Sequence, residues 1–542
     1  MNKIKLYIIL TAITATGLFL RFYHNLDISL WHDEAFSALL IKYPWGEMFY
    51  RIGLDVHPPV YYIVLRLWSY VAGNSLLALR GFSILFGLFT SLAAYGFVKA
   101  AFKSEKSALI TALLISTSPF QIQYATEARM YTFGAFLAVL AAYFLVKALE
   151  AGRESLKTKN LYYALFGIVS GLATLTHYYL LFSVAALCLY ALCYHIYYYR
   201  FAFKKYLSLL TSYLLLIAVF LPWLKWFLFQ YKQVGSGYWI PPLDRWSIPS
   251  TLWQMLLGIG IDITHKTTQV GVVLVSLFTL YFLYRFIRST INPHKWLVIL
   301  ALGAPFGGAM LFAVLAHLKG ENSSVYLVRY FLYASTFYTI ALAVWFTNFK
   351  RQWLAYVLLA IYVIVNLSAF THYWKELDVK NKSGMAQAAE LLSHNAASFD
   401  GNKIFVGSSF EFFNLKYYLS NNLGKTIGSA PLPLPALVDG HCAIDCLNFD
   451  HLPRPLLYSG GNTHASNLPH FAGTAILTDS DLLPKFADGV KQGDTVWLLW
   501  TNGFGGSKPE VPKNWTQVEE KGFAEVRPYV GTWVIITKYI VQ

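Results

Sequence analysis

Repeated apolar runs of spanning length are the feature that most restricts what this chain can fold into. About eleven such runs occur before residue 372. A helix needs roughly 20 consecutive apolar residues to cross the hydrocarbon core of a bilayer. The pattern therefore predicts a polytopic α-helical membrane protein with about eleven transmembrane helices. The runs lie near residues 6–23, 77–101, 107–120, 130–149, 161–177, 179–198, 207–228, 269–287, 296–316, 331–347 and 353–371.

Composition and charge exclude several other classes of protein. Hydrophobic residues make up 56% of the 542 residues and charged residues 13%, whereas a disordered chain needs low hydrophobicity and high charge. Residues 1–372 carry 29 Lys and Arg against 12 Asp and Glu, a net charge of +17; residues 373–542 carry 14 against 16, a net charge of −2. The sequence thus predicts a transmembrane module over 1–372 and a water-soluble domain over 373–542.

The basic residues fall in short clusters between the apolar runs, on alternate turns, which is typical of the cytoplasmic loops of membrane proteins. This positive-inside pattern explains the basic balance without nucleic acid binding. It predicts a multi-pass protein of the plasma (inner) membrane with a cytoplasmic N-terminus and an extracytoplasmic C-terminal domain. The first apolar run resembles a signal peptide but lacks a clear cleavage site, so we expect it to be retained. Amphipathic pieces at Tyr61–Tyr70 and Ser250–Ile261 are expected in the outer interface plane.

The C-terminal domain mixes one helical pattern with short strand patterns, which predicts a small α/β unit. Cys442 and Cys446 lie on the expected oxidising side, where a disulfide could form, although free thiols in a tight loop are equally compatible with the spacing. The helical stretch is Met385–Asn395, and the strand-like runs are Lys403–Gly407, Thr474–Leu477, Thr495–Trp500 and Thr532–Tyr539.

Acidic residues point to chemistry on the outer face. Asp33 and Glu34 follow the first apolar run, and His57 stands soon after them in a His-Pro-Pro sequence. Carboxylates near a bilayer are costly unless they are solvated, paired or functional. A carboxylate that reaches a substrate proton can act as a general base. The alternative is that Asp33 and Glu34 cap a short helix beginning near Glu34, since acids favour helix N-termini.

A second polar cluster lies in the loop expected between the third and fourth helices. Glu127 and Arg129 are two residues apart, flanked by Tyr124 and Tyr131. An Arg at the membrane rim can bind a phosphate oxygen pair in bidentate fashion. A mutual ion pair, or snorkelling anchors with ordinary interfacial tyrosines, would explain the same residues.

Further candidates stand at the outer ends of later helices. Arg329 and Tyr330 open the tenth apolar run, after Lys319, and an outer Arg runs against the positive-inside trend. His177 marks an outer turn. As alternatives, Arg329 and Lys319 could simply anchor their helices at the membrane surface, and His177 could have a structural role.

The sequence does not decide whether the protein binds a metal ion. Asp33, His57 and Glu127 are ligand types that suit several divalent cations, so a divalent cation is possible, but no zinc-type ligand spacing occurs. Asp479-Ser-Asp481 is most simply a loop or helix cap. No phosphate-binding glycine motif is present, and no cofactor is certain.

Taken together, these segments resemble the GT-C integral membrane glycosyltransferases, specifically the family 39-like group related to protein O-mannosyltransferases and the lipid A aminoarabinose transferase. The resemblance covers most of residues 1–371. The segments that carry it are Trp31–Ala35, His57–Tyr62, Tyr124–Tyr131, Thr176–Tyr178 and Arg329-Tyr330.

The resemblance implies an inverting transfer of a sugar from a polyprenyl-phosphate donor to a glycan, lipid or protein acceptor outside the membrane. Asp33 matches the family's catalytic acidic position, which would deprotonate the acceptor hydroxyl, with Glu34 orienting it or binding the acceptor. Arg129 and Arg329, with Lys319 as a further candidate, would bind the donor phosphate. His57, Glu127, Tyr124, Tyr131, His177 and Tyr330 would shape the pocket.

Two other functions fit the same number of helices. A transporter or lipid flippase has a similar count, but transporters often show internal repeats and polar groups near the midplane, and neither is visible here. A catalytically silent scaffold that binds a partner through its exterior domain is the third possibility. Acids gathered on the outer side favour the enzyme.

Overall fold

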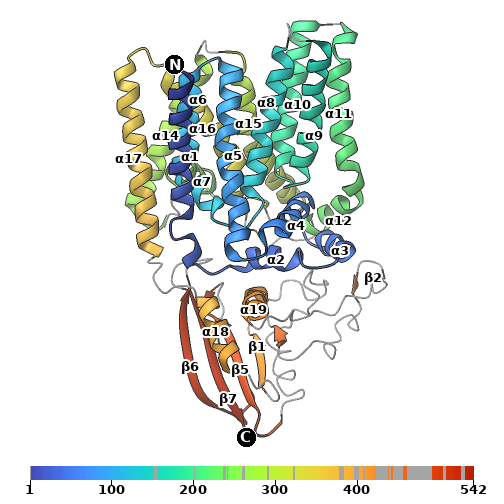
Figure 1. The fold of residues 1–542 in the computed structure, drawn as a ribbon, viewed down its shortest axis with the longest axis vertical. Helices are drawn as coiled ribbons and strands as arrows, with labels where there is room; N and C mark the ends of the chain where they lie inside the picture. The colour runs from blue at the N-terminus through green and yellow to red at the C-terminus, as the bar shows by residue number, and fades with distance from the viewer. Residues whose placement is uncertain are drawn as a thin grey trace. The chain divides into compact units, whose positions relative to one another are not determined.

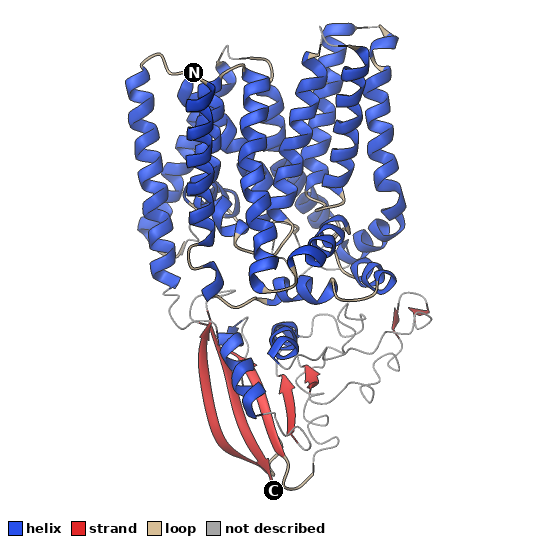
Figure 2. Cartoon of the chain, in the orientation of Figure 1, coloured by secondary structure: helices blue, strands red, loops and turns tan. Residues whose placement is uncertain are grey.

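The computed structural model divides by its contacts into two units, which are described separately. The first contains Met1–Tyr23 and Val56–Tyr373, and the second contains His24–Asp55 and Trp374–Gln542. The first is helical, and the second combines helices with strands (Figure 2). The two-domain division of the sequence stays a prediction, to which the structure adds that His24–Asp55 packs with the second unit. The structure describes residues 2–151, 155–200, 202–235, 240, 242–258, 263–289, 292–320, 324–377, 384–395, 402–406, 409–422, 437–438, 441–442, 456–459, 491–503, 508–525 and 532–542.

Nine helical segments of the described residues are long and apolar enough to cross a membrane, which supports a multi-pass membrane protein. Two further predicted runs form α6 (Glu105–Thr117) and α9 (Leu156–Thr174), which fall outside this set. The predicted polytopic helical fold is confirmed. The nine segments contain α1 (Lys3–Phe22), α5 (Leu76–Phe102), α8 (Tyr131–Glu150), α10 (Leu180–Tyr199), α11 (Leu207–Phe220) continued by α12 (Leu224–Gly235), α14 (Lys266–Arg288), α15 (Lys295–Leu318), α16 (Leu332–Thr347) and α17 (Gln352–Leu377).

Short amphipathic helices accompany the long ones. The predicted interfacial pieces form α4 (Val60–Ala72) and α13 (Ser247–Leu257). In α4, Tyr61 and Tyr62 are fully buried while Tyr70 is exposed, the one-sided burial that suits a helix lying in an interface.

The helices of the first unit pack side by side (Figure 1). α8 packs against both α5 and α9, α11 packs on α9, and α15 packs against α10 and α16. α9 and α11 approach closely at Gly167, where an added Cβ would lie 2.2 Å from the carbonyl oxygen of Ser212. Small residues permit such backbone approach between membrane helices, where packing replaces the hydrophobic effect as the driving force.

A break at Ser118-Pro119 ends α6 and starts α7 (Pro119–Ala125). The Ser118 side chain accepts a hydrogen bond from the Gln121 amide, and Pro119 takes the first helical position, where its missing N–H costs nothing. The break leaves carbonyls at the end of α6 without helical donors. The buried Arg21 of α1 donates to the Ser116 carbonyl at 2.8 Å and to the Ile115 carbonyl at 3.2 Å. Its guanidinium thus caps α6 from a neighbouring helix.

The second unit contains a five-stranded mixed sheet in the order β4-β1-β5-β7-β6. β1 (Asn402–Val406) pairs in parallel with β4 (Leu456–Ser459) and β5 (Thr495–Thr501). β7 (Thr532–Val541) pairs antiparallel with β5 and with β6 (Trp515–Glu525). Buried side chains from four strands form its core, namely Phe405, Val496, Leu498, Trp515, Tyr539 and Val541. A separate ladder joins β2 (Leu437–Val438) to β3 (His441–Cys442).

Three helices join the first outer loop to this domain. α18 (Gly384–Asn395) packs on β6 and β7, α19 (Ser409–Asn422) packs on α18, and α2 (His32–Leu40) packs on α19. The Phe413 ring lies 5.1 Å from the His32 ring and 5.8 Å from the Phe36 ring. The Leu30 amide donates to the Tyr418 hydroxyl at 2.8 Å. α3 (Trp45–Leu54) follows α2 in the same unit.

Most sequence predictions for this domain can be compared with the structure. The predicted helix is α18, and three of the predicted strand runs are β1, β5 and β7. The sequence missed α19 and β6; β6 is rich in charged residues because it is an edge strand with a largely exposed pattern. The run 474–477, the Asp479–Asp481 pair and Cys446 lie outside the described residues, so the disulfide stays a prediction.

Replacing Gly167 by Ala is expected to destabilise the α9–α11 contact by about 1–3 kcal/mol, because the new methyl group meets backbone that has no rotamer to change. Gly303→Ala on α15 is the matched control, since a Cβ there meets nothing within 4 Å. Thermal unfolding of both variants in one detergent provides the measurement. Equal unfolding temperatures for the two variants would contradict this account of the packing.

Candidate functional site

The loop that carries His57 is fixed by its prolines and by one backbone bond. Pro58 and Pro59 restrict the chain just before α4 begins at Val60. The Val60 amide donates to the Leu175 carbonyl at 2.9 Å. This bond holds the His57 loop beside the turn between α9 and α10, which carries His177.

His177 is held as a neutral hydrogen-bond donor. Its side chain is 4% exposed, and its Nδ1 accepts the Tyr179 amide proton at 3.2 Å. Burial lowers the pKa of His177 well below its ordinary value, and the neighbouring His57, Arg129 and Arg329 lower it further. With Nδ1 acting as an acceptor, the single ring proton belongs on Nε2.

Arg129 is positioned by backbone and hydroxyl contacts. Its amide donates to the Glu127 carbonyl at 2.8 Å, and the Ser83 hydroxyl of α5 donates to the Arg129 carbonyl at 3.3 Å. The guanidinium Nη2 lies 3.3 Å from Nε2 of His57. A guanidinium only donates, so His57 accepts here through a deprotonated ring nitrogen. Arg129 and His57 therefore form one polar group although 72 positions separate them.

Aromatic rings surround His177. Its ring centroid lies 4.7 Å from that of Tyr330, 5.5 Å from that of Tyr333 and 5.9 Å from that of Tyr131. Tyr131 in turn lies 5.5 Å from Tyr124. The Arg329 guanidinium lies 5.9 Å from the Tyr330 ring. Five of the predicted site residues, His177, Tyr330, Tyr131, Tyr124 and Arg329, thus lie together in the first unit, with His57 and Arg129 beside them.

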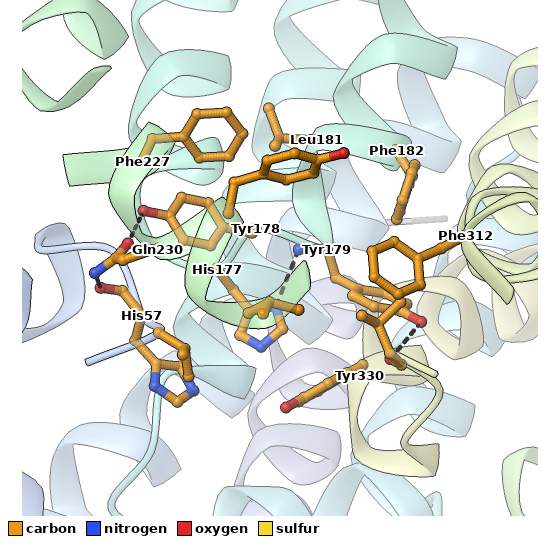
Figure 3. A pocket seen from close by; sticks show the side chains of 14 residues that line it. His57, His177, Tyr178, Tyr179, Leu181, Phe182, Phe227, Gln230, Phe312 and Tyr330 are labelled. Atoms are coloured by element: carbon orange, nitrogen blue, oxygen red, sulfur yellow. Dashed lines mark hydrogen bonds between the residues drawn. The ribbon is translucent and has the colours of Figure 1, made fainter. Parts of the chain in front are cut away.

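A cavity of about 240 Å³ opens next to this cluster. Figure 3 shows His177 between His57 and Tyr330, with Phe227, Leu181 and Phe182 along the other side. The lining residues are Val56, His57, His177, Tyr178, Tyr179, Leu181, Phe182, Phe227, Gln230, Tyr231, Val234, Phe312, Val325 and Tyr330.

Gln230 of α12 connects the cavity wall to the His57 loop. Its amide nitrogen donates to the His57 carbonyl at 3.2 Å, and its oxygen accepts from the Tyr178 hydroxyl (Figure 3). Tyr178 also accepts from the Trp223 indole at 3.0 Å. The chain of bonds fixes α12 against the α9–α10 turn, so the cavity is a built feature of the fold.

The cavity therefore has two chemically different ends. His57, His177 and Gln230 supply polar atoms, with Arg129 behind His57, while the rest of the wall is aliphatic or aromatic. Such a lining suits an amphiphile with a polar or anionic head and an apolar tail.

The remaining predicted residues lie elsewhere. Lys319 is exposed at the end of α15 and does not line the cavity, and Glu127 is buried in the loop before α8. Asp33 and Glu34 occupy the first turn of α2 in the second unit. Glu34 is fully buried and accepts the Trp31 amide at 3.4 Å, which is the helix-capping role that the sequence allowed as an alternative.

The described residues contain no cluster of side chains that could bind a metal ion. No group of three or more His, Cys, Asp or Glu side chains lies close enough to hold an ion there. A metal at Asp33, His57 and Glu127 stays a prediction of the sequence.

The sequence missed most of the cavity wall. Phe182, Phe227 and Phe312 come from α10, α12 and α15, and each lies in an apolar run full of similar residues. Gln230 was the one available signal, because an amide near the end of an apolar run is costly unless it is hydrogen-bonded.

The chain was compared with protein families, curated proteins and solved structures. A family model described as dolichyl-phosphate-mannose-protein mannosyltransferase matches residues 56–226. A search of curated proteins found no match. The crystal structure of ArnT from Cupriavidus metallidurans bound to undecaprenyl phosphate is similar, with a TM-score of 0.59, 12% identity and coverage of 99% of this chain and 98% of that chain. The apo structure of the same protein gives a TM-score of 0.60 at 12% identity, covering 98% and 97%. This likeness confirms the predicted fold, and the family match over residues 56–226 agrees with the resemblance noted in the sequence.

Two substitutions of His177 can distinguish the loss of its hydrogen-bond acceptor from the loss of its ring. His177→Leu removes the acceptor of the Tyr179 amide and is expected to cost about 1–3 kcal/mol, because a buried N–H is left without a partner. His177→Asn, which retains a side-chain oxygen, should lose less. Thermal unfolding in detergent ranks the variants, and an Asn variant as unstable as the Leu variant would argue against the bond.

Proposed function

We propose that this protein is an inverting membrane glycosyltransferase that moves a sugar from a polyprenyl-phosphate donor to an acceptor hydroxyl or amine on the outer face of the plasma (inner) membrane. The observation that carries the proposal is the cavity, apolar along its walls and cationic behind its polar end. ArnT, which shares the fold, is described in complex with undecaprenyl phosphate, a ligand of the same chemical type.

The donor would place its lipid among the aromatic side chains of α10, α12 and α15. Its phosphate would lie toward Arg129 and Arg329, and the neutral His177 would donate from Nε2 to a sugar or phosphate oxygen. Burying an isoprenoid chain against these rings is favoured by roughly 25 cal/mol per Å² of apolar surface removed from water.

Transfer would follow a single displacement. The acceptor oxygen forms a bond to the anomeric carbon, its proton passes to a carboxylate base, and the anomeric carbon–oxygen bond breaks to release lipid phosphate. Charge grows on the leaving phosphate, where fixed cations stabilise it most effectively. Arg129 is suited to this role because its loop is fixed before substrate arrives.

The base role is proposed for Asp33 on the sequence resemblance. Asp33 is half-buried in the first turn of α2, and its neighbour Glu34 accepts the Trp31 amide at the start of the same helix.

A lipid-linked donor also fits the proposed topology. Nucleotide sugars are cytoplasmic, so an outward-facing active site needs a donor that the membrane carries. The sugar and the acceptor are specified by pocket shape, and the proposal names only their chemical classes. A transporter or flippase is less well supported, because the likeness to ArnT extends over almost the whole chain.

Asp33→Asn is expected to lower the transfer rate by about 10²–10⁴-fold, since the amide cannot accept the acceptor proton. Sugar transfer by purified protein with polyprenyl-phosphate sugars and an acceptor panel gives the measurement, after folding is checked by thermal unfolding. An Asn variant as fast as wild type would remove Asp33 from the reaction. Donor movement across vesicles without turnover would favour the transporter.

Arg129 and Lys319 offer a matched test of the phosphate site. Arg129→Gln should reduce kcat/KM by about 10²–10³-fold, because a buried cation next to the leaving group is lost. Lys319→Gln should change it less than about 3-fold, because that side chain is exposed outside the cavity. Equal losses in the two variants would place the phosphate elsewhere.

A further inference from the structure

Two buried glutamates interact in the second unit, and we call them the buried carboxyl pair. Glu411 lies in the first turn of α19 and is 5% exposed, and Glu525 ends β6 and is 6% exposed. The Met385 amide at the start of α18 donates to the Glu525 carboxylate at 3.0 Å. The Asn414 side-chain amide donates to the Glu411 carboxyl group at 3.2 Å. The pair thus lies where α18 packs against both α19 and β6.

Two negative charges are unfavourable in such a poorly solvated place. Burial and, after it, the negative charge of Glu525 raise the pKa of Glu411 to about 8, although the hydrogen bond from Asn414 lowers it in part. The Oδ1 atom of Asn414 is also buried and has no hydrogen-bond donor among the described residues. A protonated Glu411 would bring a donor next to it. At neutral pH the pair therefore carries one proton and one negative charge.

Other titratable groups lie on the elements packed around α19, but the charge that shifts Glu411 is that of Glu525. Lys416, on α19 itself, interacts instead with Tyr43 and Arg51. Within the described residues, the remaining titratable groups on these elements are Glu390 and His394 on α18, which are both exposed, His32, Asp33 and Glu34 on α2, Lys403 on β1 and Tyr458 on β4.

The helices that meet at the pair also hold α2. The Phe413 ring, two residues after Glu411, lies 5.1 Å from the His32 ring at the start of α2. The Ser29 hydroxyl, just before α2, accepts the Ala386 amide of α18 at 3.2 Å. A movement of α18 or α19 would therefore reach the helix whose first turn carries Asp33.

We propose that the buried carboxyl pair is a pH-sensitive switch: it holds one proton at neutral pH, and release of that proton in alkaline solution loosens α18 and α19 and with them α2. Glu411 would then be a positioning residue for Asp33. The link to Asp33 chemistry rests on the proposed transferase function, whereas the loosening of the helices does not.

Linkage gives the direction of the effect. The pKa of Glu411 is raised from an ordinary value of 4.5 to about 8, so the folded unit binds an extra proton between these two values. The stability that this proton provides is complete at low pH and is lost as the pH rises through that range. A glutamine at position 411 stays neutral at every pH and should remove the dependence.

Hydrogen exchange followed by mass spectrometry tests the switch on the full-length protein in detergent, with rates corrected for the direct effect of pH on amide exchange. In wild type, the protection of α19 amides should fall by about 10- to 100-fold from pH 6 to pH 9. In Glu411→Gln it should change by less than about 3-fold, because no proton is lost. Glu390→Gln is the matched control and should behave as wild type, since Glu390 is exposed on α18.

Glu525→Gln provides a second, independent variant. It keeps an oxygen for the Met385 amide but removes the second negative charge, so it should also suppress the alkaline loss of protection. It keeps the test valid if Glu411→Gln does not fold. Protection in wild type that does not depend on pH, or an equal alkaline loss in wild type and in the folded Gln variants, would overturn the switch.

The positioning role has its own readout in a transfer assay. The wild-type rate should fall above about pH 8, whereas Glu411→Gln should keep its rate and exceed wild type by about 10-fold at pH 9, since small displacements of a catalytic group cost this much or more. Coinciding pH profiles of the two proteins would overturn the positioning role. Absence of transfer at every pH would count against the proposed function, and the exchange measurement would still decide the switch.

Discussion

Every break in a helix within a bilayer exposes backbone polar groups, which then need other hydrogen-bond partners. The candidate functional site depends on one such break, between α6 and α7. α6 ends at Thr117 because Pro119 cannot continue its hydrogen bonds, and Arg21 of α1 supplies donors to the Ile115 and Ser116 carbonyls. Gly87 on α5 leaves the space in which this guanidinium lies, since a Cβ there would approach it to 3.1 Å.

The chain that follows this break carries the cationic part of the site. α7 and the loop after it bring Arg129 to the start of α8, where Ser83 holds its carbonyl and Gln121 bonds to Ser335 and Thr336 of α16. A buried Arg fixed by the backbone needs little reorganisation when charge develops beside it. Packing of the membrane helices and electrostatics of the cavity are therefore parts of one arrangement.

The two units divide the proposed work between them. The first supplies an apolar cavity with Arg129 behind its polar end, which suits a lipid phosphate. The second combines the α2 helix that carries Asp33 with a mixed sheet. Because residues 24–55 belong to the second unit, the sheet of that unit has a direct structural connection to the predicted base.

The sequence by itself determined the polytopic helical class and most candidate residues, because apolar run length and rare polar residues near a membrane are local signals. His57, Arg129 and His177 were predicted from such signals, and the structure brings them together. Only the tertiary structure decided which apolar side chains line the cavity, since Phe182 and Phe312 look like any lipid-facing residues in sequence. It also decided that Lys319 lies outside the cavity and that Glu34 caps α2, because both depend on where a side chain finds its partners in space.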